Sequence, residues 1–378
     1  MVDFSQVPSP CYVIDENLLR QNLSIIKEVK DKAGIEIILA FKGFAMWSVF
    51  PIVREYINGA SASSLFEARL AFEEMKTLAH TYSPVFNESE FDEIIKYSSH
   101  ITFNSISQYQ KYLPYIEKSG RKVSAGLRIN PEFSEVHTDL YNPCAPGSRL
   151  GVSSETLKNG LPDKIEGLHF HTLCESTSYD LEKTLNIVIA KFGHLFEKIK
   201  WINMGGGHLM TRKGYDTNHL INLLKNFKDK FKIDVILEPG SAFAWETGYL
   251  TSTIEDIVEN NGIKTAILNV SFTAHMPDCL EMPYQPKILE SVDKENGQFV
   301  YRMGGNSCLA GDFIGYWHFD KELKVGDKIT FNDMIHYTMV KTTMFNGLKH
   351  PSIGIWTKEN KFILIREFFY EDYKNRLS

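Results

Sequence analysis

The first part of the chain alternates short apolar runs with longer amphipathic stretches between about Asn17 and Glu238. The strand-like runs are Glu36–Phe41, Ala60–Ser64, Leu78–Tyr82, Ile101–Asn104, Val123–Ile129, Gly167–His171, Lys200–Met204 and Asp234–Leu237, and the clearest helical stretches are Glu90–Ser98, Leu181–Ile199 and His219–Phe231. A strand followed by a helix, repeated eight times, predicts a parallel (β/α)8 barrel over residues 17–241. The alternative, a doubly wound sheet, favours a Gly-x-Gly-x-x-Gly turn after an early strand, which this sequence lacks.

From about Ala242 onward the pattern changes, because Gly, Pro, Asn and Asp separate strand-like runs and little helical spacing remains. These runs are Lys264–Ser271, Phe299–Met303, Lys328–Phe331 and Phe362–Glu367. We therefore expect an antiparallel β domain over residues 242–378. The segment Pro10–Asp15 also has strand character, so residues 1–16 are expected to join this β domain.

Composition and charge narrow the class of protein. The 378 residues are 43% apolar and 23% charged, as in globular proteins, and the formal net charge is −6. No basic excess is available to neutralise phosphates, which argues against a nucleic-acid partner. Neither a signal peptide nor an apolar stretch of about 20 residues is visible, so no membrane partner is expected. The five scattered cysteines suit free thiols in a reducing compartment, and we expect a cytoplasmic protein.

Polar residues stand at the ends of several expected strands, where barrels of this kind place functional residues. Lys42 directly follows the first run, and an amine facing a dry pocket has a lowered pKa and forms Schiff bases. The alternative is an ordinary solvated lysine. His169 and His171 lie at the end of the sixth run. Because they are two residues apart in an expected strand, both side chains would point to the same face. They could be a buried structural pair, or zinc ligands with Cys174, but no fourth ligand is evident and we expect no metal.

The last two expected barrel strands end in a glycine run and an acid. Gly205, Gly206 and Gly207 follow the seventh run, where such barrels commonly bind a phosphate group, although tight turns use glycines too. Glu238 ends the eighth run. Its carboxylate could cap a helix, or it could pair with the protonated ring nitrogen of a cofactor and so keep that ring an electron sink.

Three segments carry a resemblance to a known family. Ser271–Tyr284 has the sequence SFTAHMPDCLEMPY, His169–Glu175 has HFHTLCE, and Cys308–Asp312 has CLAGD. Over essentially its full length the chain resembles the alanine-racemase-like, fold-type-III pyridoxal-phosphate decarboxylases, which include ornithine and diaminopimelate decarboxylases. Within that family it is most similar to the branch that decarboxylates carboxyspermidine and carboxynorspermidine.

The resemblance implies a pyridoxal 5'-phosphate cofactor and roles for the barrel residues. Lys42 would hold the cofactor as a Schiff base, and His171 would stack on its ring. Arg128 would sit beside the cofactor, Gly205–Gly207 would bind its phosphate, and Glu238 would pair with the pyridine nitrogen.

The resemblance also implies roles for residues of the β domain. Tyr337 would reach the phosphate, and Cys308 would cross a dimer interface to reprotonate Cα in the partner's site, unless it is only a buried interface thiol. A homodimer with composite active sites follows. Asp278, Glu281 and Asp312 are the candidates for binding the amines of a polyamine, with Asp278 favoured because it lies in the branch-specific segment. Each of these acids could instead be a turn or surface residue.

Two positions depart from the family. Where many relatives have an arginine after Glu-Pro-Gly, this chain has Ser241, whose hydroxyl is a weaker, neutral donor to a phosphate. The acid that some relatives carry after the second strand corresponds to Ser63. Loss of the arginine also counts against diaminopimelate as the substrate, because the distal carboxylate would lack a partner.

The implied reaction is decarboxylation of carboxyspermidine or carboxynorspermidine to spermidine or norspermidine and carbon dioxide, in polyamine biosynthesis. One extra methylene is worth only about 1–3 kcal/mol of discrimination, so the sequence predicts this pair rather than one member. The alternatives are another basic amino-acid or diaminopimelate decarboxylase, or a racemase, of the same fold. A non-catalytic pyridoxal-phosphate carrier and a cofactor-free Schiff-base aldolase are further alternatives, although neither needs the whole set of residues.

Overall fold

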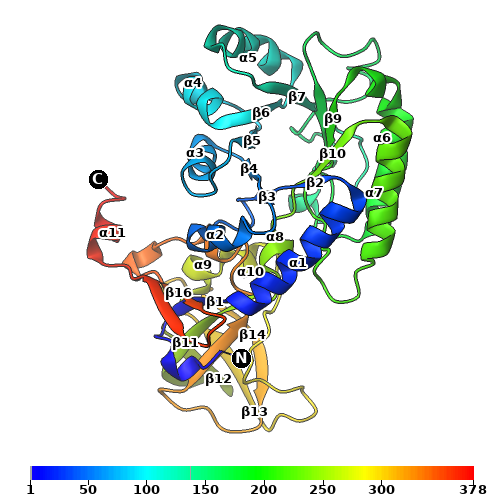
Figure 1. Cartoon of the computed structure of the whole chain (residues 1–378). Helices are drawn as coiled ribbons and strands as arrows, with labels where there is room; N and C mark the ends of the chain where they lie inside the picture. Colours follow the sequence, from blue (N-terminus) through cyan, green and yellow to red (C-terminus); the bar gives the residue numbers. More distant parts are fainter. Residues whose placement is uncertain (1, 137) are drawn as a thin grey trace. The chain divides into compact units, whose positions relative to one another are not determined.

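The computed structural model describes residues 2–136 and 138–378, and the chain divides into two compact units (Figure 1). The first comprises the chain up to Gln21 together with Ala244–Ser378, and we call it the β unit. The second comprises Asn22–Phe243, and we call it the barrel unit. The two divisions fall within helices α1 (Glu16–Ala33) and α8 (Ser241–Ala244).

The barrel unit is built on parallel strands that close into a ring. Its strands are β2 (Glu36–Ile37), β3 (Leu39–Ala40), β4 (Ala60–Ala62), β5 (Ala79–Tyr82), β6 (Ser98–Phe103), β7 (Ser124–Arg128), β8 (Gly167–His169), β9 (Trp201–Asn203) and β10 (Asp234–Leu237), in the order β2-β10-β9-β8-β7-β6-β5-β4-β3. Only Ile38 separates β2 from β3, and its N–H donates to Leu237 O at 2.9 Å. One extended segment therefore pairs with β10 on one side and β4 on the other, which closes the barrel and confirms the predicted fold class.

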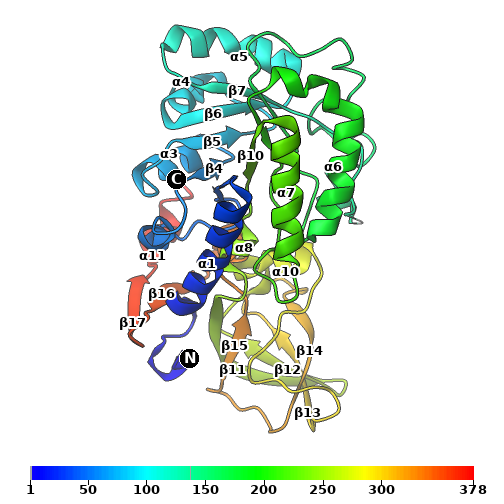
Figure 2. The same ribbon diagram turned by 45° about the vertical axis from the view of Figure 1, so that its right-hand side comes forward.

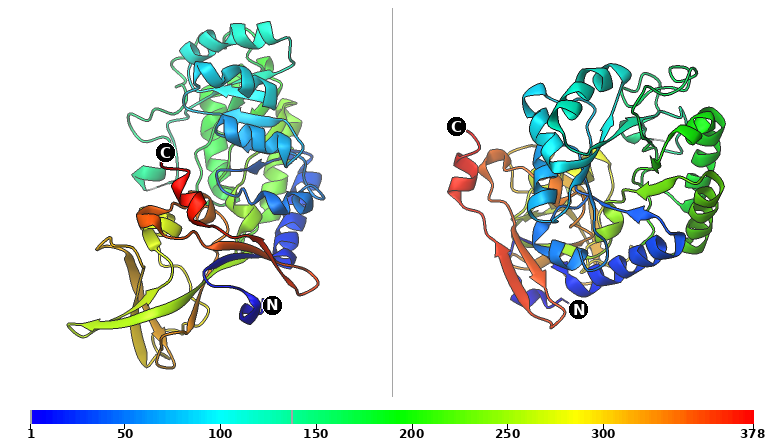
Figure 3. Two further views of the ribbon diagram at one scale, coloured as in Figure 1. Left: turned by 90° about the vertical axis from the view of Figure 1, so that its left-hand side faces the viewer. Right: turned by 45° about the horizontal axis from the view of Figure 1, so that its top comes forward.

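Helices surround this ring of strands (Figure 3, right view). The helices that lie wholly in the barrel unit are α2 (Phe50–Val53), α3 (Leu65–Glu73), α4 (Glu88–Tyr97), α5 (Ile106–Ser119), α6 (Ser178–Phe192) and α7 (Thr217–Phe231), and the 3-10 turns are η2 (Trp47–Val49), η3 (Asp139–Tyr141) and η4 (Gly193–Lys198). Helices α3, α4 and α5 pack in sequence, and α6 packs beside α7 (Figure 2). Side-chain caps fix where several begin, since Ser64, Ser105 and Asp216 each accept a backbone N–H from the first turn of α3, α5 and α7.

Two features differ from the regular repeat expected from the sequence. The first expected strand is interrupted at Ile38, as described above. After β7, residues 129–166 contain no α-helix within the part that the structure describes, and only the short turn η3 occurs there. Pro131, Pro143, Pro146 and three glycines interrupt helical spacing in this segment, which explains why the repeat fails at this point.

The amino-terminal part of the barrel interior is filled by the indole of Trp201. An ideal Cβ at Gly126 would lie 2.3 Å from this ring, and one at Gly167 would lie 2.1 Å from it. The indole N–H donates to Ser124 Oγ at 2.8 Å, so the one polar atom of this large side chain is satisfied. Glycines on two strands thus make room for one aromatic residue beneath the carboxyl ends of the strands.

The β unit has a mixed sheet of eight strands, ordered β14-β13-β12-β11-β1-β16-β17 with β15 beside β11. The strands are β1 (Cys11–Asp15), β11 (Gly248–Asn260), β12 (Ile263–Leu268), β13 (Phe299–Gly304), β14 (Phe313–Phe319), β15 (Lys328–Asn332), β16 (Ser352–Trp356) and β17 (Phe362–Arg366). The long strand β11 is visible in Figure 3. The expected participation of the N-terminal strand is confirmed, because β1 pairs with β11 and β16. The expected antiparallel β domain is confirmed as a mostly antiparallel sheet, in which the two pairs β1–β16 and β12–β13 are parallel.

Short helical segments precede, connect and follow these strands. They are η1 (Phe4–Gln6), α9 (Phe272–His275), α10 (Pro277–Glu281), η5 (Met339–Lys341), η6 (Phe345–Gly347) and α11 (Tyr370–Lys374). The side chain of Ser271 caps α9 by accepting the Ala274 N–H at 3.1 Å. Among the described residues, no helix combines the length and the apolar character that crossing a bilayer requires.

Candidate active site

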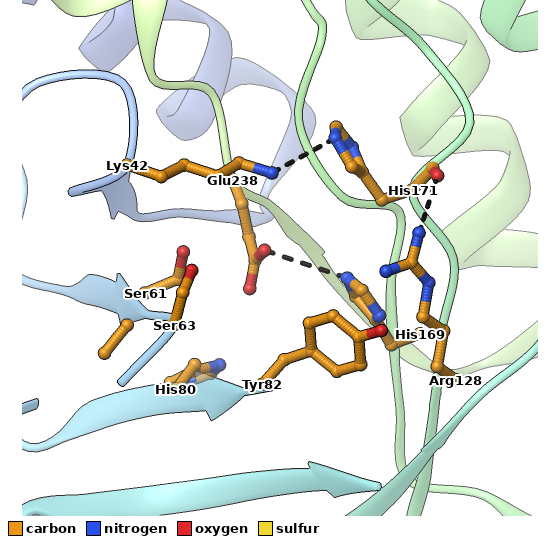
Figure 4. A pocket seen from close by; sticks show the side chains of 10 residues that line it. Lys42, Ser61, Ser63, His80, Tyr82, Arg128, His169, His171 and Glu238 are labelled. Carbon is orange, nitrogen blue, oxygen red and sulfur yellow. Dashed lines mark hydrogen bonds and ion pairs between the residues drawn. The ribbon is translucent and has the colours of Figure 1, made fainter. Parts of the chain in front are cut away.

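A cavity of about 320 Å³ opens at the carboxyl ends of the barrel strands (Figure 4). The carboxyl face of the strands is where barrels of this kind bind ligands. The lining residues are Lys42, Ser61, Ala62, Ser63, His80, Tyr82, Arg128, His169, His171 and Glu238. Three residues predicted from strand ends, Lys42, His171 and Glu238, therefore meet in one cavity with Arg128, which the resemblance implied.

Lys42 and His171 face each other across the cavity, with 3.1 Å between Lys42 Nζ and His171 Nε2. The Gly206 N–H donates to His171 Nδ1 at 3.0 Å, so Nδ1 is an acceptor and the ring proton of the neutral imidazole is on Nε2. The Nε2–H group can only donate, and Lys42 accepts this hydrogen bond only as an uncharged amine. The geometry therefore favours the nucleophilic form of Lys42.

The electrostatic surroundings act in the same direction. Loss of hydration lowers the pKa of Lys42, and the positive Arg128 adds to this effect while Glu238 opposes it. The Lys42 side chain remains open to the cavity, so protein surrounds the amine without sealing it from ligands. Burial also holds the pKa of His171 well below its usual value, with further contributions from Lys42 and Arg128. His171 is thus a neutral ring at neutral pH.

Glu238 provides the acid end of the cavity. Asn203 Nδ2 donates to Glu238 Oε1 at 2.6 Å, while His169 Nε2 lies 3.8 Å from Oε2, too far for a hydrogen bond. Burial alone would raise the pKa of Glu238, but His169 and the Asn203 hydrogen bond outweigh it and lower the pKa to about 2. The carboxylate is therefore ionised, with Oε2 turned towards the cavity side that His169 lines.

Arg128 forms part of the cavity wall and is buried at the end of β7. One guanidinium nitrogen donates to His171 O at 3.1 Å, and the guanidinium carbon lies 4.7 Å from the centre of the Tyr82 ring. The Tyr82 hydroxyl donates to Asn104 Oδ1 at 2.9 Å. Tyr82 and Arg128 hold each other in place, and Arg128 fixes the backbone that carries His171.

The glycine run lies directly after β9, but much of its donor capacity is used within the protein. The Gly205 N–H donates to Asn203 Oδ1 at 2.9 Å, and the Gly206 N–H donates to His171. Among the described residues, no backbone hydrogen bond donated by the Gly207 N–H is seen. Ser241 begins the short helix α8 and is not among the residues that line the cavity. Ser63 does line it, and its N–H donates to Glu67 Oε2 at 2.6 Å.

The predicted amine-binding acids lie in the β unit, each in a different setting. Asp278 is buried, its Oδ2 accepts hydrogen bonds from Tyr284 (2.9 Å) and Thr338 (2.8 Å), and its Oδ1 is buried without a partner among the described residues. Glu281 is exposed and forms an ion pair with Lys341. Of these three acids, Asp278 alone combines burial with an oxygen that still lacks a hydrogen bond within the described residues.

Asp312 is buried too, but backbone N–H groups occupy both of its oxygens. Phe272 and Thr273 donate to Oδ1 at 2.7 and 3.1 Å, and Ser307 donates to Oδ2 at 3.0 Å. These bonds tie the start of α9 to the loop before β14, as expected for a structural turn residue.

Cys308 and Tyr337 also belong to the β unit. The Cys308 thiol is exposed, and the backbone N–H of Cys308 donates to Asn346 Oδ1 at 2.8 Å. Tyr337 has a φ of 40°, a left-handed backbone conformation that is costly for an aromatic residue. Such strain persists only where the surroundings impose it, and it is concentrated at functional sites.

Sequence reasoning missed Asn203 and the cavity residues Ser61, His80 and Tyr82. Tyr82 and Asn203 end strands β5 and β9, so the rule that drew attention to Lys42 and Glu238 applies to them as well. His80 lies inside β5 and stacks on His100, with ring centres 3.8 Å apart. A polar residue in the middle of an apolar run gave no sign that it faces the cavity.

The cavity residues fit a pyridoxal phosphate group. An amine of lowered pKa, a neutral imidazole ring and an ionised carboxylate line one cavity and suit the aldehyde, the ring face and the ring nitrogen. Both ring nitrogens of His169, which is buried in the same wall, have no hydrogen-bond partner within residues 2–136 and 138–378. Buried polar atoms without partners are rare, and a polar ligand in the cavity would satisfy them.

Comparisons with known proteins agree with this reading of the cavity. Residues 11–335 match the family described as pyridoxal-dependent decarboxylase, C-terminal sheet domain. The chain is 51% identical to a carboxyaminopropylagmatine decarboxylase of Synechocystis sp., with 99% of this chain and 96% of the relative covered. It is 44% identical to a carboxynorspermidine/carboxyspermidine decarboxylase of Campylobacter jejuni, with 99% of each chain covered.

A solved structure is similar over the same extent. The crystal structure of a Campylobacter jejuni carboxynorspermidine decarboxylase in complex with norspermidine matches with a TM-score of 0.90 at 43% identity, and covers 98% of this chain and 100% of its own. A diaminopimelate decarboxylase at 16% identity has a TM-score of 0.82, which shows the shared fold. The family uses pyridoxal phosphate, and its members named above are decarboxylases. This chain belongs to the pyridoxal-dependent decarboxylases.

Proposed function

We propose that this enzyme decarboxylates carboxyspermidine or carboxynorspermidine and releases spermidine or norspermidine and carbon dioxide. The observation that carries the proposal is the full-length similarity, at 43% identity, to the carboxynorspermidine decarboxylase whose structure contains norspermidine. The cavity supports it, because Lys42, His171 and Glu238 provide what the cofactor requires. A cytoplasmic location goes with this proposal, since free cysteines suit a reducing compartment.

In this proposal the barrel residues hold and tune the cofactor, while the β unit contributes to the substrate site. Pyridoxal phosphate, when bound, supplies an electron sink for the pair released as the Cα–carboxylate bond breaks. Lys42 would attach it, His171 and Arg128 would hold its ring, and Glu238 would keep the ring nitrogen protonated. Gly207, with Ser241 and Tyr337, would bind its phosphate.

We propose further that the enzyme is a homodimer with composite sites. In this arrangement Cys308 of one copy enters the site of the other and returns a proton to Cα. The exposed thiol of Cys308 supports the proposal, as do exposed apolar side chains of the same loop and of β14, which are Leu309, Phe313 and Tyr316. Apolar clusters at a surface mark interaction sites.

Asp278 is our candidate for the residue that binds the distal amine. Two hydroxyl groups occupy its Oδ2, so only Oδ1 is left for a cation. A single oxygen suits an ammonium group, whereas a guanidinium binds best to both oxygens of a carboxylate at once. This arrangement favours an amine-ended substrate.

A second candidate substrate is carboxyaminopropylagmatine, the substrate named for the Synechocystis relative at 51% identity. Its agmatine part ends in a guanidinium, so the Asp278 carboxylate would have to bind a guanidinium instead of an ammonium group. The ratio of kcat/KM for the two carboxylated polyamines decides between the two candidates: the substrate with the much larger kcat/KM is the one that the enzyme prefers.

The test is carbon dioxide release from carboxyspermidine, carboxynorspermidine, carboxyaminopropylagmatine, ornithine and meso-diaminopimelate. We expect release from the first two and loss of release in Lys42→Ala, with Lys27→Ala, an exposed lysine of α1 that pairs with Asp31, as the control. Preferential release from carboxyaminopropylagmatine would establish the second candidate. Release from ornithine or diaminopimelate alone would contradict both.

The dimer is tested by mixing two inactive variants. Lys42→Ala and Cys308→Ser, refolded or co-expressed together, would form mixed dimers in which one site has both Lys42 and Cys308. Recovery of activity above that of either variant alone supports composite sites. A monomer in analytical ultracentrifugation that is fully active would contradict the proposal.

A further inference from the structure

The acid end of the cavity depends on a residue that does not line it. Asn203 is the last residue of β9 and is 2% exposed. Its amide makes two short hydrogen bonds, from Nδ2 to Glu238 Oε1 at 2.6 Å and from the Gly205 N–H to Oδ1 at 2.9 Å. One buried side chain thus joins the acid at the end of β10 to the glycine turn after β9.

The orientation of this amide is fixed by the backbone. A peptide N–H can only donate, so the oxygen of the Asn203 amide must face Gly205 and the NH2 group must face Glu238. An NH2 group that approaches Oε1 stabilises this oxygen as an acceptor, and it therefore favours the ionised carboxylate. It also occupies one oxygen and leaves Oε2 for a ligand in the cavity.

The same amide reaches the other side of the cavity through the glycine turn. Gly205 has a φ of +71°, and a Cβ there would lie 2.5 Å from Phe170 O, so this turn is tightly confined. Gly206, the next residue, donates its N–H to His171 Nδ1 and sets the ring proton on the nitrogen that faces Lys42. Displacing Gly205 would move this donor as well.

We propose that Asn203 is a positioning residue that holds Glu238 ionised and aimed, and through the glycine turn fixes the His171 tautomer. This inference rests on the proposed function for its kinetic consequences, but not for its effect on cofactor binding. Asn203 is not among the residues that line the cavity, so its effects are expected to pass through Glu238 and His171.

Two variants separate positioning from simple packing. Asn203→Leu keeps the number and branching of the side-chain heavy atoms but removes both hydrogen bonds. Asn203→Asp keeps the shape and can replace both bonds only while it shares a proton with Glu238, because two carboxylates at this distance cannot both be ionised. The other groups around Glu238 are His169 and His80, whose pKa values are lowered so that they stay neutral, and the cations Lys42 and Arg128.

A matched control makes the same chemical change elsewhere. Asn269 of the β unit is partly buried, and its Oδ1 accepts the Thr253 N–H at 2.9 Å. Asn269→Asp therefore tests for a general cost of replacing a structural asparagine by an acid. Circular dichroism and urea unfolding of every variant show whether it folds.

The measurements are the dissociation constant of pyridoxal phosphate, the pH dependence of its absorption band in the resting enzyme, and kcat and KM. For Asn203→Leu we expect cofactor affinity and kcat to fall about 10- to 100-fold, as for residues that orient metal ligands, with KM changed less than kcat. For Asn203→Asp we expect near wild-type affinity at low pH, and a loss as pH rises that neither wild type nor Asn269→Asp shows.

Wild-type cofactor affinity in a folded Asn203→Leu would overturn the proposal. So would a flat pH profile for Asn203→Asp, even if Asn203→Leu fails to fold. If no carboxylated polyamine is turned over by the wild type, the proposed function fails, while cofactor affinity and the absorption band still decide the role of Asn203.

Discussion

The barrel unit and the β unit both bury carboxylates but use them differently. In the barrel unit, Glu238 receives one hydrogen bond from an amide side chain and keeps its other oxygen beside the cavity. In the β unit, both oxygens of Asp312 accept hydrogen bonds from backbone N–H groups, whereas one oxygen of Asp278 has no partner among the described residues. A carboxylate saturated by the backbone holds a turn, and one with a spare oxygen can bind a ligand.

The two units also supply their functional residues in different ways. The barrel collects single residues from the ends of several strands, so changes there are expected to affect the chemistry. The acids of the β unit are bonded to other segments of that unit, so changes there are expected to affect substrate choice at Asp278 and local stability at Asp312.

The largest effect is expected at the barrel acid. Glu238→Gln keeps the shape but removes the charge that holds the ring nitrogen protonated, so kcat should fall about 10²- to 10³-fold, as when a preorganised electrostatic group is lost. Steady-state kinetics on the carboxylated polyamine measures this. Glu155→Gln, an exposed acid paired with Lys158, is the control and should be unchanged. A Glu238→Gln enzyme that keeps most of its kcat would contradict the assignment.

The next effect is expected at the β-unit acid with the spare oxygen. Asp278→Asn should raise KM for the polyamine about 10- to 100-fold through loss of a charged hydrogen bond, while cofactor affinity stays unchanged. Glu281→Gln, which alters a neighbouring acid that is exposed and paired with Lys341, is the matched control. Loss of cofactor binding in Asp278→Asn, or an equal effect in Glu281→Gln, would break the division between the units.

A third prediction concerns stability. Gly126→Ala places a Cβ 2.3 Å from the Trp201 ring in the barrel, and overpacking of this kind should lower the free energy of unfolding by about 1–3 kcal/mol. Gly311→Ala in the β unit meets nothing within 4 Å and should change it by less than about 0.5 kcal/mol. Urea unfolding of both variants measures the difference. Equal destabilisation would show that the Trp201 packing is not as confined as described.

The smallest effect is a pH dependence. In the cofactor-free protein, the pKa of Lys42 is lowered from its ordinary value of 10.5 mainly by lost hydration. Between the lowered pKa and 10.5 the unfolded chain binds the extra proton, so stability should rise with pH in that window and the penalty should disappear above it. Lys42→Met should lack this slope in urea unfolding between neutral and alkaline pH. A parallel slope in both proteins would contradict the lowered pKa.

Much of the fold followed from the sequence because barrel strands buried on both faces give short continuous apolar runs. The strands β11, β14 and β16 were missed, since β11 carries charged and polar residues along half its length and the other two contain glycine. The break at Ile38 could not be predicted, because it depends on pairing with strands far away in the sequence.

The residues of the candidate site also fall into those that the sequence identified and those that it did not. Lys42, His171 and Glu238 were identifiable because a charged or polar residue directly after an apolar run is unusual. Asn203 also ends a strand, so the same rule applies to it, but an uncharged asparagine at a strand end is equally compatible with an ordinary turn. The donors of Gly205 and Gly206 turn inward to Asn203 and His171, and no property of a glycine run reveals which of its N–H groups remain for a ligand.

The segment that closes the barrel also has a consequence for how the enzyme matures. Lys42 follows β3 by two residues, and β2 in the same segment pairs with β10, which is made nearly 200 residues later. During synthesis the lysine therefore has no complete pocket until the last strand joins the first. Cofactor capture by the newly made chain should mark the moment of ring closure, and a nascent chain that ends before Asp234 should not retain the cofactor.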